Sequence, residues 1–211
     1  KFLTGEQGFM QWANDMSNAL YDNGFCWASG ACRVVIFHDE WDFVLKFTYD
    51  KEELIDYCRN EDYLYAKAKA WGVEQAFASC EYVGRFALYD IYVMDRCYCN
   101  EDGMSDDSYD LQYKKYCSEY GLDPDENDSM EEFSDNCPEY EDQECMLELA
   151  AEHWGEQFAR KVIDFICEFG INDCHCGNWG WINDRLVIVD YAGYGDFARA
   201  IRNRRIKECG R

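Results

Sequence analysis

The chain has 211 residues, enough for one domain or two small lobes with a substantial core. Hydrophobic residues make up 48% of it and aromatic residues 17%, a composition that excludes a disordered chain. The formal net charge of −23 argues against nucleic acid and anionic membranes as main partners, because both are bound through an excess of Lys and Arg.

Thirteen cysteines are scattered along the chain, and no two of them form a C-x-x-C pair, the commonest zinc and redox signature. Two C-x-C pairs, Cys97/Cys99 and Cys174/Cys176, leave a zinc site as an alternative. We favour reduced thiols that fill apolar space in a cytoplasmic protein. No apolar stretch reaches the length of a membrane-spanning helix.

The N-terminal part predicts a helix followed by short strands. Apolar residues at helical spacing indicate an amphipathic helix over residues 5–21. Two strands are expected within 25–37, on either side of a turn that contains Gly30. A third strand, over 42–48, carries Lys46.

A second helix and two further strands complete this part of the chain. A capping-box pattern opens a helix over 50–71 that contains Glu61, and Gly72 ends it. The next two strands are expected at 78–83 and 87–94, with the turn between them at Gly84-Arg85.

Residues 100–145 form an acidic insertion. A helix is predicted over 108–120, ended by Gly121, and the rest is expected to be partly irregular, solvated acidic surface. The residues from Asp123 on resemble the start of a calcium loop. An EF-hand is rejected, because Asp128 stands where the loop needs Gly and Ser134 where it needs a bidentate Glu.

The C-terminal part predicts one long helix, a loop, a strand and a short helix. A broad apolar face indicates a helix over 146–169 that ends at Gly170. A buried strand is expected at 186–189. The final helix, 196–211, carries a basic cluster that we expect to pair with the protein's own acids; an anionic partner is the alternative.

The loop before that strand and the strand's end bring three polar residues into one region. Asp173 and Asn178 lie in the loop, and Asp190 follows the strand. A general base, an amide and a carboxylate suit a magnesium-dependent phosphoryl-transfer site, since Mg²⁺ prefers oxygen ligands and shares them with phosphates. The alternative is an Asx-rich turn before a core strand.

The stretch Asp173-Cys-His-Cys-Gly-Asn178 resembles the D-x-H-x-G-N catalytic loop of the protein-kinase-like superfamily, in its aminoglycoside-phosphotransferase-like form. Asp190-Tyr-Ala-Gly193 resembles the D-F-G element that follows that loop. The resemblance implies that Asp173 accepts the proton of the acceptor hydroxyl, while Asn178 and Asp190 hold Mg²⁺.

The same resemblance implies an α+β, bilobal fold with ATP between the lobes. Residues 1–95 would form a small antiparallel-sheet N-lobe, and 96–211 a truncated, mostly helical C-lobe with its catalytic loop at 171–193. For ATP binding, Gly30 would cover the phosphates, Lys46 would reach them, and Glu61 would orient Lys46. Asp95 and Cys97 would form the hinge whose backbone binds adenine.

Three departures from the superfamily pattern are visible. The glycine loop has only Gly30, and Asn172 stands where many protein kinases carry an Arg that reads a phosphorylated activation loop. The chain after Asp190 is too short for the helices on which protein kinases bind peptides. Substrate recognition would therefore use the acidic insertion, the N-terminal helix or a protein partner.

The predicted function is an ATP- and Mg²⁺-dependent phosphotransferase that acts on a hydroxyl of an unidentified protein or small-molecule acceptor. An acidic face would suit a cationic acceptor. Two alternatives stay open: a pseudokinase that acts as a binding module, and a nucleotidyl transferase on the same fold.

Overall fold

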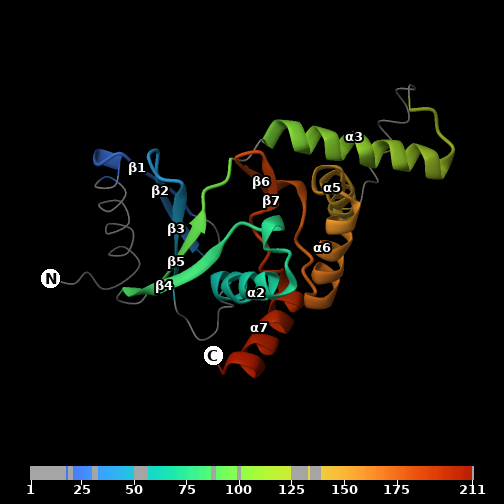
Figure 1. Cartoon of the computed structure of the whole chain (residues 1–211). Helices are drawn as coiled ribbons and strands as arrows, with labels where there is room; N and C mark the ends of the chain where they lie inside the picture. The colour runs from blue at the N-terminus through green and yellow to red at the C-terminus, as the bar shows by residue number, and fades with distance from the viewer. Residues whose placement is uncertain are drawn as a thin grey trace.

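The computed structural model describes residues 18, 21–29, 33–49, 57–86, 89–98, 101–124, 133 and 139–210 (Figure 1). Most of the helix predicted at 5–21 lies outside these residues, as does Gly30. None of the helices in the described ranges is long and apolar enough to cross a membrane.

The chain has an α+β fold built on a five-stranded antiparallel sheet of order β1-β2-β3-β5-β4. The strands predicted around Gly30 and Lys46 are confirmed, with ends shifted by one or two residues. The bounds are β1 Phe25–Ser29, β2 Arg33–His38, β3 Phe43–Tyr49, β4 Cys80–Phe86 and β5 Tyr89–Asp95.

The register of the sheet places several polar side chains on one face. Arg33 lies opposite Thr48, and Lys46 lies opposite both Val35 and Tyr92. Because side chains alternate along a strand and directly opposed residues share a face, Arg33 and Lys46 point to the same side. That side is covered by α2 (Tyr57–Trp71), which lies to the right of the sheet in Figure 1.

Three helices end in the same way, each at a glycine that the sequence predicts as a stop. Gly72, Gly121 and Gly170 have φ values of 70°, 67° and 67°. In each case the amide of the next residue donates to the carbonyl five positions earlier, as in Ile171 to Ile166 at 3.0 Å. This Schellman arrangement requires a left-handed residue, which glycine adopts at no steric cost.

The turn predicted at Gly84-Arg85 is wrong, because both residues belong to β4. The pairing passes from Tyr82 opposite Tyr92 to Gly84 opposite Ile91, so Val83 is an extra, bulged residue. A glycine within a strand often marks such a bulge, and Gly84 has a φ of 154°.

The bulge decides where Arg85 points. After the one-residue shift Arg85 lies opposite Asp90, and its Nε donates to Asp90 Oδ1 at 2.7 Å. Arg59 from α2 bonds the other oxygen of the same carboxylate. We call Asp90, Arg59 and Arg85 the Asp90 cluster. Without the bulge, Arg85 would face away from α2.

The single helix predicted at 146–169 is also wrong: α5 (Glu139–Trp154) and α6 (Glu156–Phe169) meet at Gly155. Gly155 has a φ of 78°, which an uninterrupted helix does not allow. The apolar spacing continues through the break, so periodicity did not reveal it.

Helices also fill more of the acidic insertion than predicted. α3 (Glu101–Tyr120) begins well before residue 108, consistent with the acids at 101 and 102, which favour a helix N-terminus. It packs against α5, and its Tyr113 and Tyr116 form a small aromatic cluster with Phe133.

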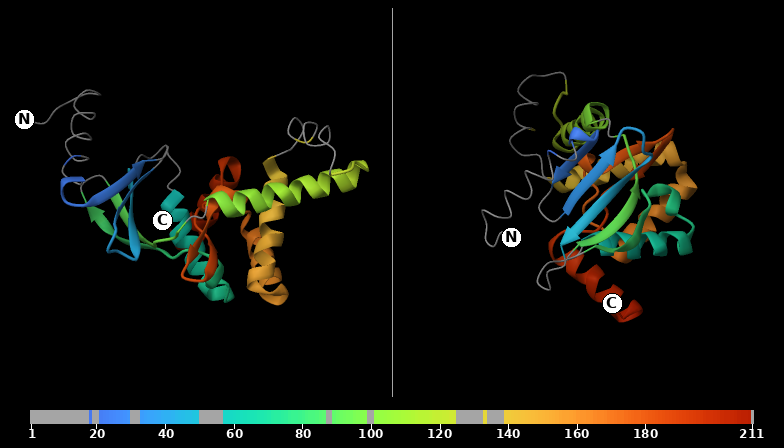
Figure 2. Two further views of the ribbon diagram at one scale, coloured as in Figure 1. Left: turned by 90° about the horizontal axis from the view of Figure 1, so that it is seen from above. Right: turned by 90° about the vertical axis from the view of Figure 1, so that its left-hand side faces the viewer.

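The C-terminal part contains a two-stranded hairpin, β6 (Trp179–Ile182) and β7 (Arg185–Ile188), then α7 (Gly195–Cys209). β7 confirms most of the strand predicted at 186–189, whereas β6 was not predicted. The views in Figures 1 and 2 agree that α2 and this hairpin lie between the sheet at one end of the molecule and α5 with α6 at the other.

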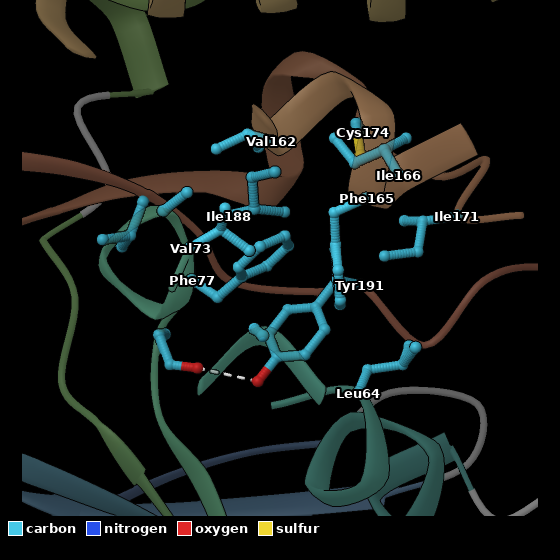
Figure 3. Close-up of a cluster of buried hydrophobic side chains, with 14 of the residues drawn as sticks. Leu64, Val73, Phe77, Val162, Phe165, Ile166, Ile171, Cys174, Ile188 and Tyr191 are labelled. Carbon is cyan, nitrogen blue, oxygen red and sulfur yellow. Dashed lines mark hydrogen bonds between the residues drawn. The ribbon is translucent and has the colours of Figure 1, made fainter. Parts of the chain in front are cut away.

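The main core lies where α2, α6 and β7 meet. Phe77 and Phe165 pack edge to face with ring centroids 5.4 Å apart, and Phe77 meets Tyr191 at 5.0 Å (Figure 3). The hydroxyl of Tyr191 donates to the carbonyl of Ala78 at 2.8 Å. The core thus fixes the chain next to Asp190.

Candidate functional site

Lys46 and Glu61 meet between the sheet and α2. Lys46 Nζ donates to Glu61 Oε2 at 3.0 Å, and both side chains are buried. Burial alone lowers the pKa of Lys46, but attraction to Glu61 and its neighbours outweighs that effect and raises it. Burial raises the pKa of Glu61, while Lys46 and Arg33 counteract the rise. The pairing predicted for these residues is present.

Arg33, which the sequence analysis did not single out, joins this pair to Asp190. Its Nη1 donates to Glu61 Oε1 at 2.9 Å, and its Nη2 bonds Asp190 Oδ2. We call Glu61, Lys46, Arg33 and Asp190 the Glu61 cluster. It connects β2, β3, α2 and the end of the β7 segment, and it pairs two cations with two carboxylates.

The carboxyl of Asp190 is held ionised by this arrangement. Burial raises its pKa, but attraction to Arg33 and Lys46 outweighs burial and leaves the pKa below its ordinary value. Asp190 is also the most accessible acid of the cluster, with 29% of its side chain exposed while Glu61 is fully buried. It is therefore the carboxylate that a ligand can reach.

Two buried thiols flank Glu61. Cys80 Sγ lies 3.6 Å from Glu61 Oε2, and Arg33 Nη1 lies 4.0 Å from Cys58 Sγ. Burial raises the pKa of Cys58 to about 12, so this thiol stays protonated near neutral pH. No disulfide links the ten cysteines in the described ranges. Those beside Glu61 act as small apolar neighbours of the ion pairs.

The loop from Ile171 to Asn178 is held by hydrogen bonds to its backbone carbonyls. Asn178 Nδ2 donates to the carbonyl of Asp173 at 2.8 Å, and Val189 N donates to the carbonyl of Asn178 at 2.8 Å. Trp179 Nε1 donates to the carbonyl of Cys174 at 2.8 Å. The Val189 contact ties the loop to the segment that leads from β7 to Asp190.

Asp173 lies beside His175, with 3.6 Å between Oδ1 and Nε2. Burial raises the pKa of Asp173 above its ordinary value; His175 and Arg33 oppose this rise, and Asp190 adds to it. The mutual influence of Asp173 and Asp190 places both carboxyls in one electrostatic environment. A carboxyl with a raised pKa is better suited to accept a proton than an ordinary surface Asp.

The residues predicted as a hinge lie on the segment that leaves β5. The Asp95 side chain accepts a bond from Ser79 N at 3.0 Å, and Cys97 Sγ donates to the carbonyl of Asp95 at 3.6 Å. The next residue, Tyr98, pairs with Trp181 of β6 through two backbone bonds of 2.9 Å. This segment therefore joins the sheet to the hairpin.

Asn178 and Asp190 carry the kind of oxygen atoms that a magnesium ion prefers. The amide nitrogen of Asn178 is committed to Asp173, which leaves the side-chain oxygen as the atom that can ligate a cation. Asp190 supplies a carboxylate that already attracts a cation, the guanidinium of Arg33. One or two such oxygen ligands with substrate phosphates are the usual magnesium environment.

Two polar residues, one half-buried and one fully buried, were missed by sequence reasoning. Arg33 carries no motif, and only the β2–β3 register shows that it shares a face with Lys46. Asn60 is fully buried and donates to the carbonyl of Ala198 at 3.0 Å, which ties α2 to α7. Its position next to Glu61 in the sequence was the only available signal.

The structure therefore brings together Lys46, Glu61 and Asp190, and it places Asp173 and Asn178 on the adjoining loop. Gly30 lies outside the described residues. No protein-family model matches the chain, and a comparison with curated proteins finds no relative.

Proposed function

We propose that the protein is an ATP- and Mg²⁺-dependent phosphotransferase with the two-lobed arrangement of the protein-kinase-like superfamily. The N-lobe would comprise residues 1–95 and the C-lobe 96–211. The observation that carries the proposal is the buried Lys46–Glu61 pair connected to Asp190, in the order that the motif resemblance requires. Four segments, β2, β3, α2 and the chain after β7, contribute to this cluster, and charged groups with shifted pKa values are typical of functional sites.

In this proposal Lys46 binds the nucleotide phosphates, and Glu61 holds the ammonium in position. Asn178 and Asp190 hold the magnesium ion, which supplies charge neutralisation on the phosphates. Asp173 accepts the proton of the acceptor hydroxyl as the oxygen attacks the terminal phosphorus atom. The bond to the ADP oxygen then breaks, and the proton stays on the Asp173 carboxyl until solvent removes it.

The adenine would bind along the backbone of the 95–97 segment, and Gly30 would lie over the phosphates. The acceptor is a hydroxyl compound. The net charge of −23 favours a cationic acceptor, such as an aminoglycoside-like amine or a basic protein.

A second candidate is a pseudokinase that binds partners without catalysis. The Arg33–Asp190 pair favours it, because a guanidinium already neutralises the carboxylate that would hold magnesium. Nucleotidyl transfer is a variant of the first candidate, since the same residues would serve it.

The test is incubation with ATP labelled in its terminal phosphate, with Mg²⁺, followed by mass analysis of the protein and of candidate cationic acceptors. A mass gain of one phosphate supports phosphotransfer, and a gain of one AMP supports nucleotidyl transfer. If neither mass gain is seen and calorimetry nevertheless shows that the protein binds ATP, the result would support the pseudokinase.

A further inference from the structure

The Glu61 cluster contains a cation that the motif resemblance does not require. Arg33 lies with 18% of its side chain exposed and forks between two acids, Glu61 and Asp190. Glu61 already has a cationic partner in Lys46, so it does not need Arg33 for charge compensation. The contact that distinguishes Arg33 is the one from Nη2 to Asp190, the carboxylate proposed to hold the metal.

We propose that Arg33 is a resident counterion that occupies Asp190 in the metal-free protein and makes metal binding conditional on nucleotide. The inference rests on the proposed function. A divalent cation and the Arg33 guanidinium compete for the Asp190 carboxylate, and two cations bound to one carboxylate repel each other. In this proposal metal binding displaces the Nη2 arm from Asp190 by charge repulsion, while the Nη1 arm keeps its contact with Glu61.

Nucleotide supplies the missing compensation. The polyphosphate brings several negative charges next to the cluster, where they attract the released guanidinium as well as the metal. Metal alone then binds weakly, because Arg33 competes for Asp190. Nucleotide alone binds next to Lys46 and Arg33 without the metal. Each ligand therefore raises the affinity of the protein for the other. By linkage, this coupling is the same in both directions.

The geometry also explains why an arginine is needed here. A guanidinium presents a planar fork of donors, so it can hold one acid with one nitrogen and a second acid with the other. A lysine at position 33 has a single ammonium group and cannot hold both carboxylates in this way. The sheet register that places Arg33 on the same face as Lys46 supplies the required direction.

The experiment measures Mn²⁺, a paramagnetic substitute for Mg²⁺, by the loss of the free-ion signal in electron paramagnetic resonance, without nucleotide. Asp190→Asn defines the background from the many surface carboxylates. We expect Arg33→Gln to bind Mn²⁺ about tenfold or more tightly than wild type, because the competing cation is gone. Arg59→Gln is the matched control, since Arg59 pairs with Asp90 instead, and it should bind Mn²⁺ like wild type.

If Arg33→Gln fails to fold, as judged by its thermal melt, Arg33→Lys replaces it and should bind Mn²⁺ more tightly than wild type by a smaller factor. Equal Mn²⁺ affinity in wild type and the Arg33 variant would overturn the inference, even if phosphate transfer is observed. The same holds if the variant binds no more Mn²⁺ than Asp190→Asn. A chain that transfers no phosphate, yet gains Mn²⁺ affinity on loss of Arg33, would overturn the phosphotransferase proposal alone.

Discussion

Two groups of ion pairs share one face of the sheet, and they differ in the exposure of their cations. In the Glu61 cluster, Lys46 and Arg33 have 6% and 18% of their side chains exposed. In the Asp90 cluster, Arg59 and Arg85 have 32% and 45% exposed around an equally buried acid. The more exposed arginines can recover more water when their acid is lost than Lys46 and Arg33 can. Similar contacts thus carry different energetic consequences.

The clusters also differ in what they connect. Asp90, Arg85 and Arg59 come from two neighbouring strands and the helix that covers them, so their contacts stabilise one packing interface. The Glu61 cluster reaches Asp190, 157 positions from Arg33 in the sequence. We expect the first cluster to affect stability and the second to affect ligand binding and turnover as well.

The largest effect should come from removing the proposed base. Asp173→Asn should lower turnover about 10²–10⁴-fold, because a positioned general base contributes that much. ATP binding should be nearly unchanged, whereas Asp190→Asn should lose both turnover and metal-dependent ATP binding. Steady-state kinetics and calorimetry check this, with Asp90→Asn as the control that retains turnover below its melting temperature. Equal loss of ATP binding in the Asp173 and Asp190 variants would refute this division of roles.

The next effect concerns stability. Glu61→Gln leaves Lys46 and Arg33 buried with less compensation and should reduce the free energy of unfolding by about 3–5 kcal/mol. Asp90→Asn should cost less, about 1–3 kcal/mol, because Arg59 and Arg85 can be solvated. Urea denaturation of the three proteins gives both values. A larger loss for Asp90→Asn would contradict the comparison.

The bulge at Gly84 provides a test of the Asp90 cluster through the backbone. Gly84→Ala meets open space but must adopt a φ of 154°, a conformation that costs a residue with a side chain about 1–3 kcal/mol. We expect the variant to relieve part of this backbone strain by a local shift that moves Arg85 away from Asp90. If so, Arg85→Ala should add little further destabilisation in the Gly84→Ala background, and full additivity would argue against this coupling.

The smallest effect is a pH dependence. Hydrogen bonding to Arg85 lowers the pKa of Asp90 below its ordinary 3.8, against the opposing effect of burial. The unfolded chain then binds more protons at this site than the folded chain. The contribution of Asp90 is therefore complete above about pH 4 and declines as the pH falls through the folded pKa. The stability difference between wild type and Asp90→Asn should shrink in acid, and thermal melts across pH 2–6 measure it.

Local signals predicted much of the fold. Gly72, Gly121 and Gly170 were expected to end helices, and each does so with a left-handed turn. Lys46 on a strand and Glu61 on the following helix were also predicted in order. Their pairing was predicted only because of the family resemblance, since no local sequence pattern specifies a contact between a strand and a helix.

The remaining errors come from features without a local signature. Gly155 interrupts a periodic apolar face, and a glycine inside a helix costs only about 1 kcal/mol, so its presence does not dictate a break. The bulge at Gly84 depends on pairing with β5, and the role of Arg33 depends on strand register and on Asp190. These are tertiary determinants that a single sequence does not show.

The anchoring of Tyr191 has a kinetic consequence for its neighbour. Its ring is fully buried against Phe77, and its hydroxyl is bound to the carbonyl of Ala78. A backbone rotation that moves Asp190 away from Arg33 would expose this ring and leave a buried carbonyl without its donor. Both effects disfavour slow exchange between backbone conformations at Asp190. We expect Asp190 to keep a single backbone state through a catalytic cycle. Any on–off control would then act through the Arg33 side chain or the position of α2.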